Sequence, residues 1–129
     1  TRDTDNAHIT RAALEAQGYQ TYDLMDAFEG DTGQDVKIIR VDGGLVANSF
    51  VCQFLADILD VQIDVPKVIE TTAWGAACLA GLQSGVFNDL NDMSKSWKAD
   101  KTYSTNMDAN KRTALLKGWT KSIELLNRN

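Results

Sequence analysis

The chain has 129 residues, of which 43% are hydrophobic and 24% are charged, proportions that are typical of one soluble globular domain and exclude a collagen-like or disordered chain. Acidic residues outnumber basic ones by 18 to 13, and no basic cluster alternates with aromatic residues, so nucleic-acid binding is disfavoured. No window reaches the roughly 18 consecutive apolar residues that a membrane span needs. We therefore expect a single domain over residues 1–129, located in the cytoplasm, with no membrane or nucleic-acid partner.

Residues 7–28 are predicted to form the first helix. Apolar or small residues recur there at intervals of three and four, which is the spacing of one helix face. Residues 3–6 offer capping side chains before it, and residues 30–33 supply a turn after it. Gly18 is expected to weaken the middle of this helix.

A strand–helix–strand unit is predicted next. Residues 36–41 are short and β-branched, which favours a buried strand, and an apolar stripe then predicts a helix over about residues 45–60. Val61, Ile63 and Val65 alternate with polar residues before Pro66, which predicts a second strand that stops at the proline. Two strands joined in this way are expected to lie parallel, with a right-handed crossover.

The rest of the chain is predicted to contain two more helices. Residues 73–81 form one whose small face is expected to pack closely against a neighbouring element, with Gly85 as its C-terminal cap; the face consists of Ala73, Ala76, Ala77 and Ala80. Residues 86–107 are polar and predict an irregular surface segment with room for one short element. A C-terminal helix follows, with Thr105 and Asn106 as candidate caps. The predicted fold class is α/β, in the order helix–strand–helix–strand–helix with a C-terminal helix.

Few side chains in the sequence suggest catalysis. His8 is the only histidine, and no Ser/His/Asp or Cys/His grouping can be built around it, so a packing or surface role is favoured. Cys52 and Cys78 lie in apolar stretches without a CxxC pair, which predicts reduced, buried thiols. The scattered acids lack metal-site spacing and are read as solvated charges; they are Asp57, Asp60, Asp64 and Glu70. Core or interface positions are expected for the three tryptophans, Trp74, Trp97 and Trp119.

The most informative stretch is the turn at Asp42-Gly43-Gly44, where a strand leads directly into a helix. Glycines allow positive φ and a close approach of a ligand to the main chain, and the N–H groups of the new helix can face an anion. Asn48 could present an amide to the edge of a heteroaromatic ring. The alternative is that the glycines only make a tight turn and Asn48 is a solvated helix residue. The pattern is neither GxGxxG nor a phosphate-binding P-loop.

Three segments together resemble the glycerol kinase family, of the sugar-kinase branch of the actin-like ATPases. They are His8-Ile9-Thr10-Arg11-Ala12-Ala13-Leu14-Glu15, Arg40-Val41-Asp42-Gly43-Gly44-Leu45-Val46-Ala47-Asn48-Ser49-Phe50 and Thr71-Thr72-Ala73-Trp74-Gly75-Ala76-Ala77-Cys78-Leu79-Ala80-Gly81. The resemblance covers about the first 87 residues closely and continues through Gly118-Trp119. It implies the C-terminal portion of the second, nucleotide-binding lobe, with a ribonuclease-H-like sheet and flanking helices.

The resemblance also implies a role for three residues in binding ATP or ADP. Gly43 and Gly44 would lie against the α-phosphate and ribose, and Asn48 would contact the adenine. The intact enzyme would use Mg²⁺ and glycerol, but the family's aspartate base and glycerol-binding side chains precede the matched region. No catalytic or metal-binding residue is therefore assigned, and the isolated chain is expected to be inactive.

Two alternatives to an ATP-dependent glycerol kinase stay open at this point. The chain could be a non-catalytic interaction or regulatory module of the same fold, or part of a related kinase for another polyol or sugar. Because the lobe's opening strands and its partner lobe would also lie upstream, we expect an uncovered sheet edge and a homo-oligomer.

Overall fold

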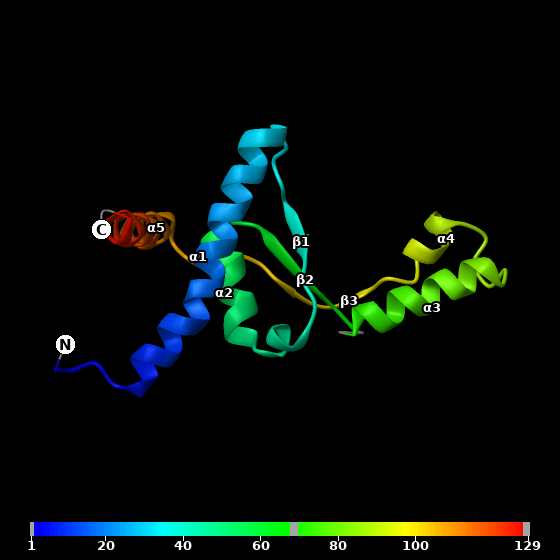
Figure 1. Cartoon of the computed structure of the whole chain (residues 1–129), viewed down its shortest axis with the longest axis horizontal. Helices are drawn as coiled ribbons and strands as arrows, with labels where there is room; N and C mark the ends of the chain where they lie inside the picture. Colours follow the sequence, from blue (N-terminus) through cyan, green and yellow to red (C-terminus); the bar gives the residue numbers. More distant parts are fainter. Residues whose placement is uncertain (1, 68–69, 128–129) are drawn as a thin grey trace.

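The computed structural model describes residues 2–67 and 70–127. In chain order its elements are α1 (Asn6–Thr32), β1 (Ile38–Arg40), the 3-10 turn η1 (Gly44–Ala47), α2 (Ser49–Leu59), β2 (Gln62–Pro66), α3 (Thr71–Gln83), α4 (Leu90–Ser94), β3 (Ala99–Tyr103) and α5 (Ala109–Leu126). The sheet, α1 and α2 form the middle of the molecule, with α3 and α4 at one end and α5 at the other (Figure 1). Within the described ranges, no helix is long and apolar enough to span a membrane.

The sheet has the order β1-β2-β3, and β1 lies parallel to β2, as the strand–helix–strand pattern predicts. Ile39, Ile63 and Tyr103 pair across the three strands and contribute to the core against α2. The prediction of an irregular segment over residues 86–107 is wrong, because β3 pairs antiparallel with β2 and α4 precedes it. Since β3 is a mostly exposed strand at the sheet edge, its polar residues carry no alternating hydrophobic pattern.

The core is built around α2. Its buried face is nearly continuous and consists of Val51, Cys52, Phe54, Leu55, Ala56 and Ile58. This helix packs on α1 on one side and on β2 and β3 on the other. It begins at Ser49 and not near residue 45 as predicted, because the four residues of η1 first turn the chain.

Helix α1 runs unbroken through Gly18, and the expected weakening of its middle, which concerns stability, stays a prediction. Gly18 is the buried residue of this helix, and a Cβ atom placed there would lie 2.7 Å from the Phe54 ring. The glycine therefore lets α1 and α2 approach closely. The helix begins at a capping box, in which the Asp5 carboxylate accepts a hydrogen bond from the His8 N–H at 3.0 Å. That hydrogen bond lowers the pKa of Asp5.

We predict that Gly18→Ala lowers the free energy of unfolding by about 1–2 kcal/mol, because overpacking against Phe54 outweighs the better helix propensity of alanine. Gly118→Ala is the matched control, since it also lies within a helix and its Cβ would meet no atom within 4 Å. This control should be neutral or stabilising. Urea unfolding of the two variants checks the difference, and equal effects would contradict the packing role.

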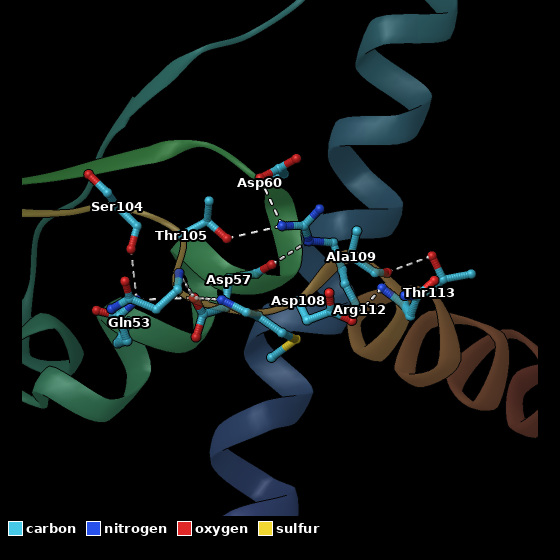
Figure 2. Close-up of polar contacts among 12 residues, drawn as sticks. Gln53, Asp57, Asp60, Ser104, Thr105, Asp108, Ala109, Arg112 and Thr113 are labelled. Atoms are coloured by element: carbon cyan, nitrogen blue, oxygen red, sulfur yellow. Dashed lines mark hydrogen bonds and ion pairs between the residues drawn. The ribbon is translucent and has the colours of Figure 1, made fainter.

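The C-terminal helix α5 is fastened to the far end of α2 by Arg112 (Figure 2). The Arg112 Nε donates to the Asp57 carbonyl oxygen at 2.7 Å, and Nη2 donates to Asp60 Oδ1 at 2.8 Å and to Thr105 Oγ1 at 3.0 Å. The Asp57 carboxylate in turn accepts from the main-chain N–H groups of Asn106 and Met107. These contacts fix the loop that leads from β3 into α5.

Helix α5 has a different cap and a second attachment. Asp108 accepts hydrogen bonds from the N–H groups at the start of the helix, so the prediction of Thr105 or Asn106 as the cap is wrong. Trp119 stacks on Tyr19 of α1 with ring centroids 5.2 Å apart, and its Nε1 donates to Asp23 at 2.8 Å. This confirms the predicted interface position of Trp119.

Helix α3 extends away from the sheet, and its main contact with another element is with α4 (Figure 1). Its four predicted packing residues are exposed, so the expectation of close packing fails for the described part of the chain; they are Ala73, Ala76, Ala77 and Ala80. Trp74 is likewise 38% exposed and not in the core. Ser84 caps the helix, and Gly85 follows at φ +77°, with the Val86 N–H bonded to the Gly81 carbonyl. Gly85 thus helps to end the helix as predicted.

We predict that Arg112→Ala lowers the free energy of unfolding by about 2 kcal/mol, because it leaves the Asp57 carbonyl and Asp60 without their donor. Lys111→Ala is the control, since the neighbouring Lys111 side chain is exposed and has no recorded ion pair or hydrogen bond among the described residues. Arg112→Lys should restore little, because an ammonium group cannot reach several acceptors in the same plane. A loss no larger than that of Lys111→Ala would contradict the role of Arg112.

Candidate functional site

The glycine turn leaves the sheet at the end of β1. The Val41 N–H still donates to the Asp64 carbonyl at 3.0 Å, which keeps the chain paired with β2 up to this residue. Gly43 then adopts φ +86° and ψ 178°, a combination that is open essentially only to glycine. From there η1 turns the chain into α2, with the Val46 N–H bonded to the Gly43 carbonyl.

The two glycines of the turn differ in what the fold requires of them. At Gly43 the backbone conformation itself requires glycine. At Gly44 the φ angle is outside the left-handed region, and an added Cβ would meet no atom within 4 Å. Nothing in the described part of the chain therefore explains why residue 44 has no side chain. The space in front of Gly44 is open to a ligand that approaches the main chain.

Asn48 lies at the other end of η1, as the N-cap of α2 and not one turn inside the helix as predicted. Its Oδ1 accepts from the Phe50 N–H at 3.0 Å, so this oxygen is already used in holding the helix start. Its side chain is exposed. The Nδ2 group has no recorded hydrogen bond within the described ranges, so it is available to donate a hydrogen bond to a ligand.

A small cluster of buried side chains packs η1, which follows the turn, against α2 and β2. Val46, Cys52 and Val65 pack together, and the Cys52 thiol donates to the Val46 carbonyl with a sulfur–oxygen distance of 3.3 Å. Burial raises the pKa of the Cys52 thiol, so it stays protonated at neutral pH. Cys52 and Cys78 are both free and buried, as predicted. The cluster seats η1 on α2 and β2.

Beside the turn lies a groove of about 400 Å³ whose lining comes from β1, α3, α4 and the segment between α4 and β3. Its lining includes Arg40, Thr71, Trp74 and Trp97. The Arg40 guanidinium carbon lies 4.0 Å from the centroid of the Trp97 ring, so Trp97 is half-buried against Arg40 and lies outside the core clusters. The Thr71 hydroxyl donates to the Asp42 carboxylate at the start of the turn. Sequence reasoning missed this Asp42–Thr71 pair, because a separation of 29 residues leaves no local pattern.

The remaining polar residues are mostly structural. His8 belongs to the capping box of α1. Asp57 and Asp60 hold Arg112 and the loop before α5, and the largely buried Asp64 accepts from Gln62 and Thr102. The prediction of solvated charges is therefore wrong for Asp57 and Asp64, which are half-buried and buried, whereas Asp60 is exposed as predicted although it is paired with Arg112. No group of three or more His, Cys, Asp or Glu residues that could hold a metal ion occurs among residues 2–67 and 70–127.

We predict opposite outcomes for alanine at the two neighbouring glycines. Gly43→Ala should lower the free energy of unfolding by about 1–3 kcal/mol, because alanine is strained at this φ and ψ. Gly44→Ala should leave stability unchanged to within about 0.5 kcal/mol, because its Cβ enters open space. Thermal unfolding of both variants checks this pair, and a Gly44→Ala that is as unstable as Gly43→Ala would show that residue 44 is also needed for the fold.

Comparisons with known proteins agree on one kind of relative. The profile of the FGGY family of carbohydrate kinases, C-terminal domain, matches residues 1–84. The glycerol kinase of Nitrosomonas eutropha is 54% identical over 125 residues, which are 97% of this chain and 25% of that protein. The glycerol kinase of Rhodospirillum rubrum is 51% identical over 123 residues, or 95% of this chain and 25% of that protein. The chain thus spans about a quarter of the length of these relatives.

Solved structures show the same likeness in three dimensions. The crystal structure of Plasmodium falciparum glycerol kinase with ADP has a TM-score of 0.83 and 34% identity, over 96% of this chain and 25% of that chain. Ligand-bound xylulose kinase from Lactobacillus acidophilus has a TM-score of 0.78 and 26% identity, over 99% of this chain and 26% of that chain. These likenesses confirm the predicted α/β fold class, part of an actin-like ATPase lobe.

Proposed function

Because the chain belongs to the FGGY family of carbohydrate kinases, we propose that it forms the adenosine-binding part of an ATP-dependent glycerol kinase. The observation that carries this proposal is the 54% and 51% identity to glycerol kinases over nearly the whole chain. Identity to the xylulose kinase and gluconate kinase structures is only 26%. The reaction would transfer the γ-phosphoryl group of ATP to a hydroxyl group of glycerol.

Three residues of the turn would contact the nucleotide. The backbone conformation of Gly43 turns the chain so that Gly44 lies at the surface. Because Gly44 has no side chain, the α-phosphate and ribose could approach its backbone. Asn48 would donate from Nδ2 to a ring nitrogen of adenine, since its Oδ1 caps α2. The ADP named for the Plasmodium falciparum structure supports a nucleotide ligand.

The catalytic half of the reaction is not assigned to this chain. We assign no Mg²⁺ ligand to this chain and propose that the ion accompanies ATP in the intact enzyme, because Mg²⁺ is commonly held by substrate phosphates together with one or two carboxylates. The carboxylate base and the glycerol-binding side chains would belong to the three quarters of the relatives' length that this chain does not match. The isolated chain should accordingly phosphorylate no glycerol.

Titration with ADP tests the proposal. We expect saturable binding that Gly44→Val abolishes, because the two methyl groups would occupy the open space in front of the turn. Gly30→Val is the control, since its Cβ also meets no atom within 4 Å and it lies in α1. Calorimetry measures both variants, with circular dichroism to verify that they fold. Absence of ADP binding by the wild type would favour a non-catalytic interaction or regulatory module.

The choice of glycerol over another polyol or sugar needs its own measurement. In the full-length protein, kcat/KM should be higher for glycerol than for xylulose or gluconate, the substrates named for the more distant solved relatives. A preference for xylulose or gluconate would indicate a different kinase of the family.

We further propose that the protein is a homo-oligomer in the cytoplasm. The outer edge of β1 has no strand partner in the described part of the chain, and Ile38 on this strand is 54% exposed. Exposed strand edges and apolar side chains favour association, and free cysteines suit a reducing compartment. Sedimentation of the chain at high concentration should reveal species larger than a monomer, and a purely monomeric profile would contradict self-association.

A further inference from the structure

Three consecutive residues before the glycine turn are each attached to a different part of the molecule. The Arg40 side chain stacks on Trp97, which precedes β3. The Val41 N–H is bonded to Asp64 of β2. The Asp42 carboxylate accepts a hydrogen bond from the hydroxyl of Thr71, the first residue of α3. The chain is therefore held in three directions immediately before Gly43.

The Asp42–Thr71 hydrogen bond is the last of these attachments along the chain. Beyond it, an added Cβ at Gly43 or Gly44 would meet no atom within 4 Å, so the space in front of these two residues is open. The far side of the turn is held through the Val46 N–H, which is bonded to the Gly43 carbonyl, so rotation about the Asp42 backbone would displace the near side. A bond from the Asp42 side chain to a second helix opposes this rotation.

We propose that Asp42 and Thr71 are positioning residues for nucleotide binding, because their hydrogen bond orients the chain as it enters Gly43. The inference rests on the proposed function, since it concerns the same turn. Neither side chain needs to touch the nucleotide. The bond acts by holding the backbone of Gly44 where the α-phosphate and ribose would approach it.

The Asp42–Thr71 hydrogen bond lies where it contributes little to the stability of the fold. Asp42 is exposed and Thr71 is half-buried, and exposed polar pairs contribute little to global stability. Both residues also lie outside the core clusters around α2. Loss of the bond should therefore change nucleotide binding while the fold stays intact.

The test uses the full-length protein that contains this chain, with Thr71→Val, which removes the hydroxyl and keeps the side-chain volume. We expect the KM for ATP and the Kd for ADP to rise about tenfold, as for loss of one charge-assisted hydrogen bond, with the KM for glycerol and the melting temperature unchanged. Thr71→Ser should restore wild-type binding. Thr72→Val is the control, because Thr72 is adjacent and exposed and has no recorded hydrogen bond among the described residues.

Substitution of the acceptor, Asp42, tests the same hydrogen bond. Asp42→Ala should weaken nucleotide binding as much as Thr71→Val, and the double variant should be no weaker than either single one, because both changes remove one interaction. Should Thr71→Val fail to fold, Asp42→Ala compared with Asp42→Asn carries the same expectation, since the amide oxygen of asparagine can still accept from Thr71.

The experimental outcomes distinguish failure of the positioning role from failure of the proposed nucleotide-binding function. Nucleotide binding that Thr71→Val and Asp42→Ala leave unchanged overturns the positioning role alone. A parallel change in the KM for ATP, the KM for glycerol and the melting temperature also overturns it, because the bond would then serve the fold in general. A wild-type protein that binds no nucleotide overturns the proposed function and this inference together.

Discussion

The burial of α2 is the constraint on which the rest of the structure depends. This helix is enclosed by α1 on one side and by β2 and β3 on the other, and Cys52, Ala56 and Ile58 are fully buried in it. Burial of each large apolar side chain contributes on the order of 1.5–3 kcal/mol. Gly18 lets α1 approach, and Arg112 attaches α5 to the carboxyl end of α2. Helices α1 and α5, strands β2 and β3 and the turn η1 are thereby placed relative to a single helix.

The same constraint places the glycine turn. Because Asn48 caps α2 and Cys52 is bonded to Val46, the turn is seated on the best-packed helix of the molecule. Its backbone is then fixed from the other side by the strand pairing at Val41 and by the Asp42–Thr71 bond. A backbone held from both sides can receive a ligand with little loss of conformational freedom. Preorganisation of this kind would let the proposed binding surface form without a cluster of charged side chains.

Sequence patterns predict the buried parts of this fold and miss the parts that depend on distant contacts. The β1–α2–β2 unit follows from short β-branched runs and an apolar stripe, which is why its parallel pairing could be predicted. The expected burial of β1 is wrong, because the strand covers only Ile38–Arg40 and is mostly exposed. Strand β3 could not, because Ala99–Tyr103 is exposed at the sheet edge and lacks alternation. The alanine face of α3 was expected to be packed, but it is exposed in the described part of the chain. For the site, the turn at Gly43 is predictable from its glycines, whereas the role of Asn48 as a cap depends on where η1 ends. The assignment of Gly43, Gly44 and Asn48 to a nucleotide came from the resemblance and remains a prediction.

Amide hydrogen exchange of the full-length protein with and without ADP tests the central claim most directly. The account predicts that ADP slows exchange at the amides of residues 43–50, where the turn, η1 and the start of α2 would face the nucleotide. Exchange in α5, which is attached at the opposite end of α2, should change little. Protection confined to the groove around Trp74 and Trp97, with none over residues 43–50, would contradict the assignment of the glycine turn as the nucleotide-binding element.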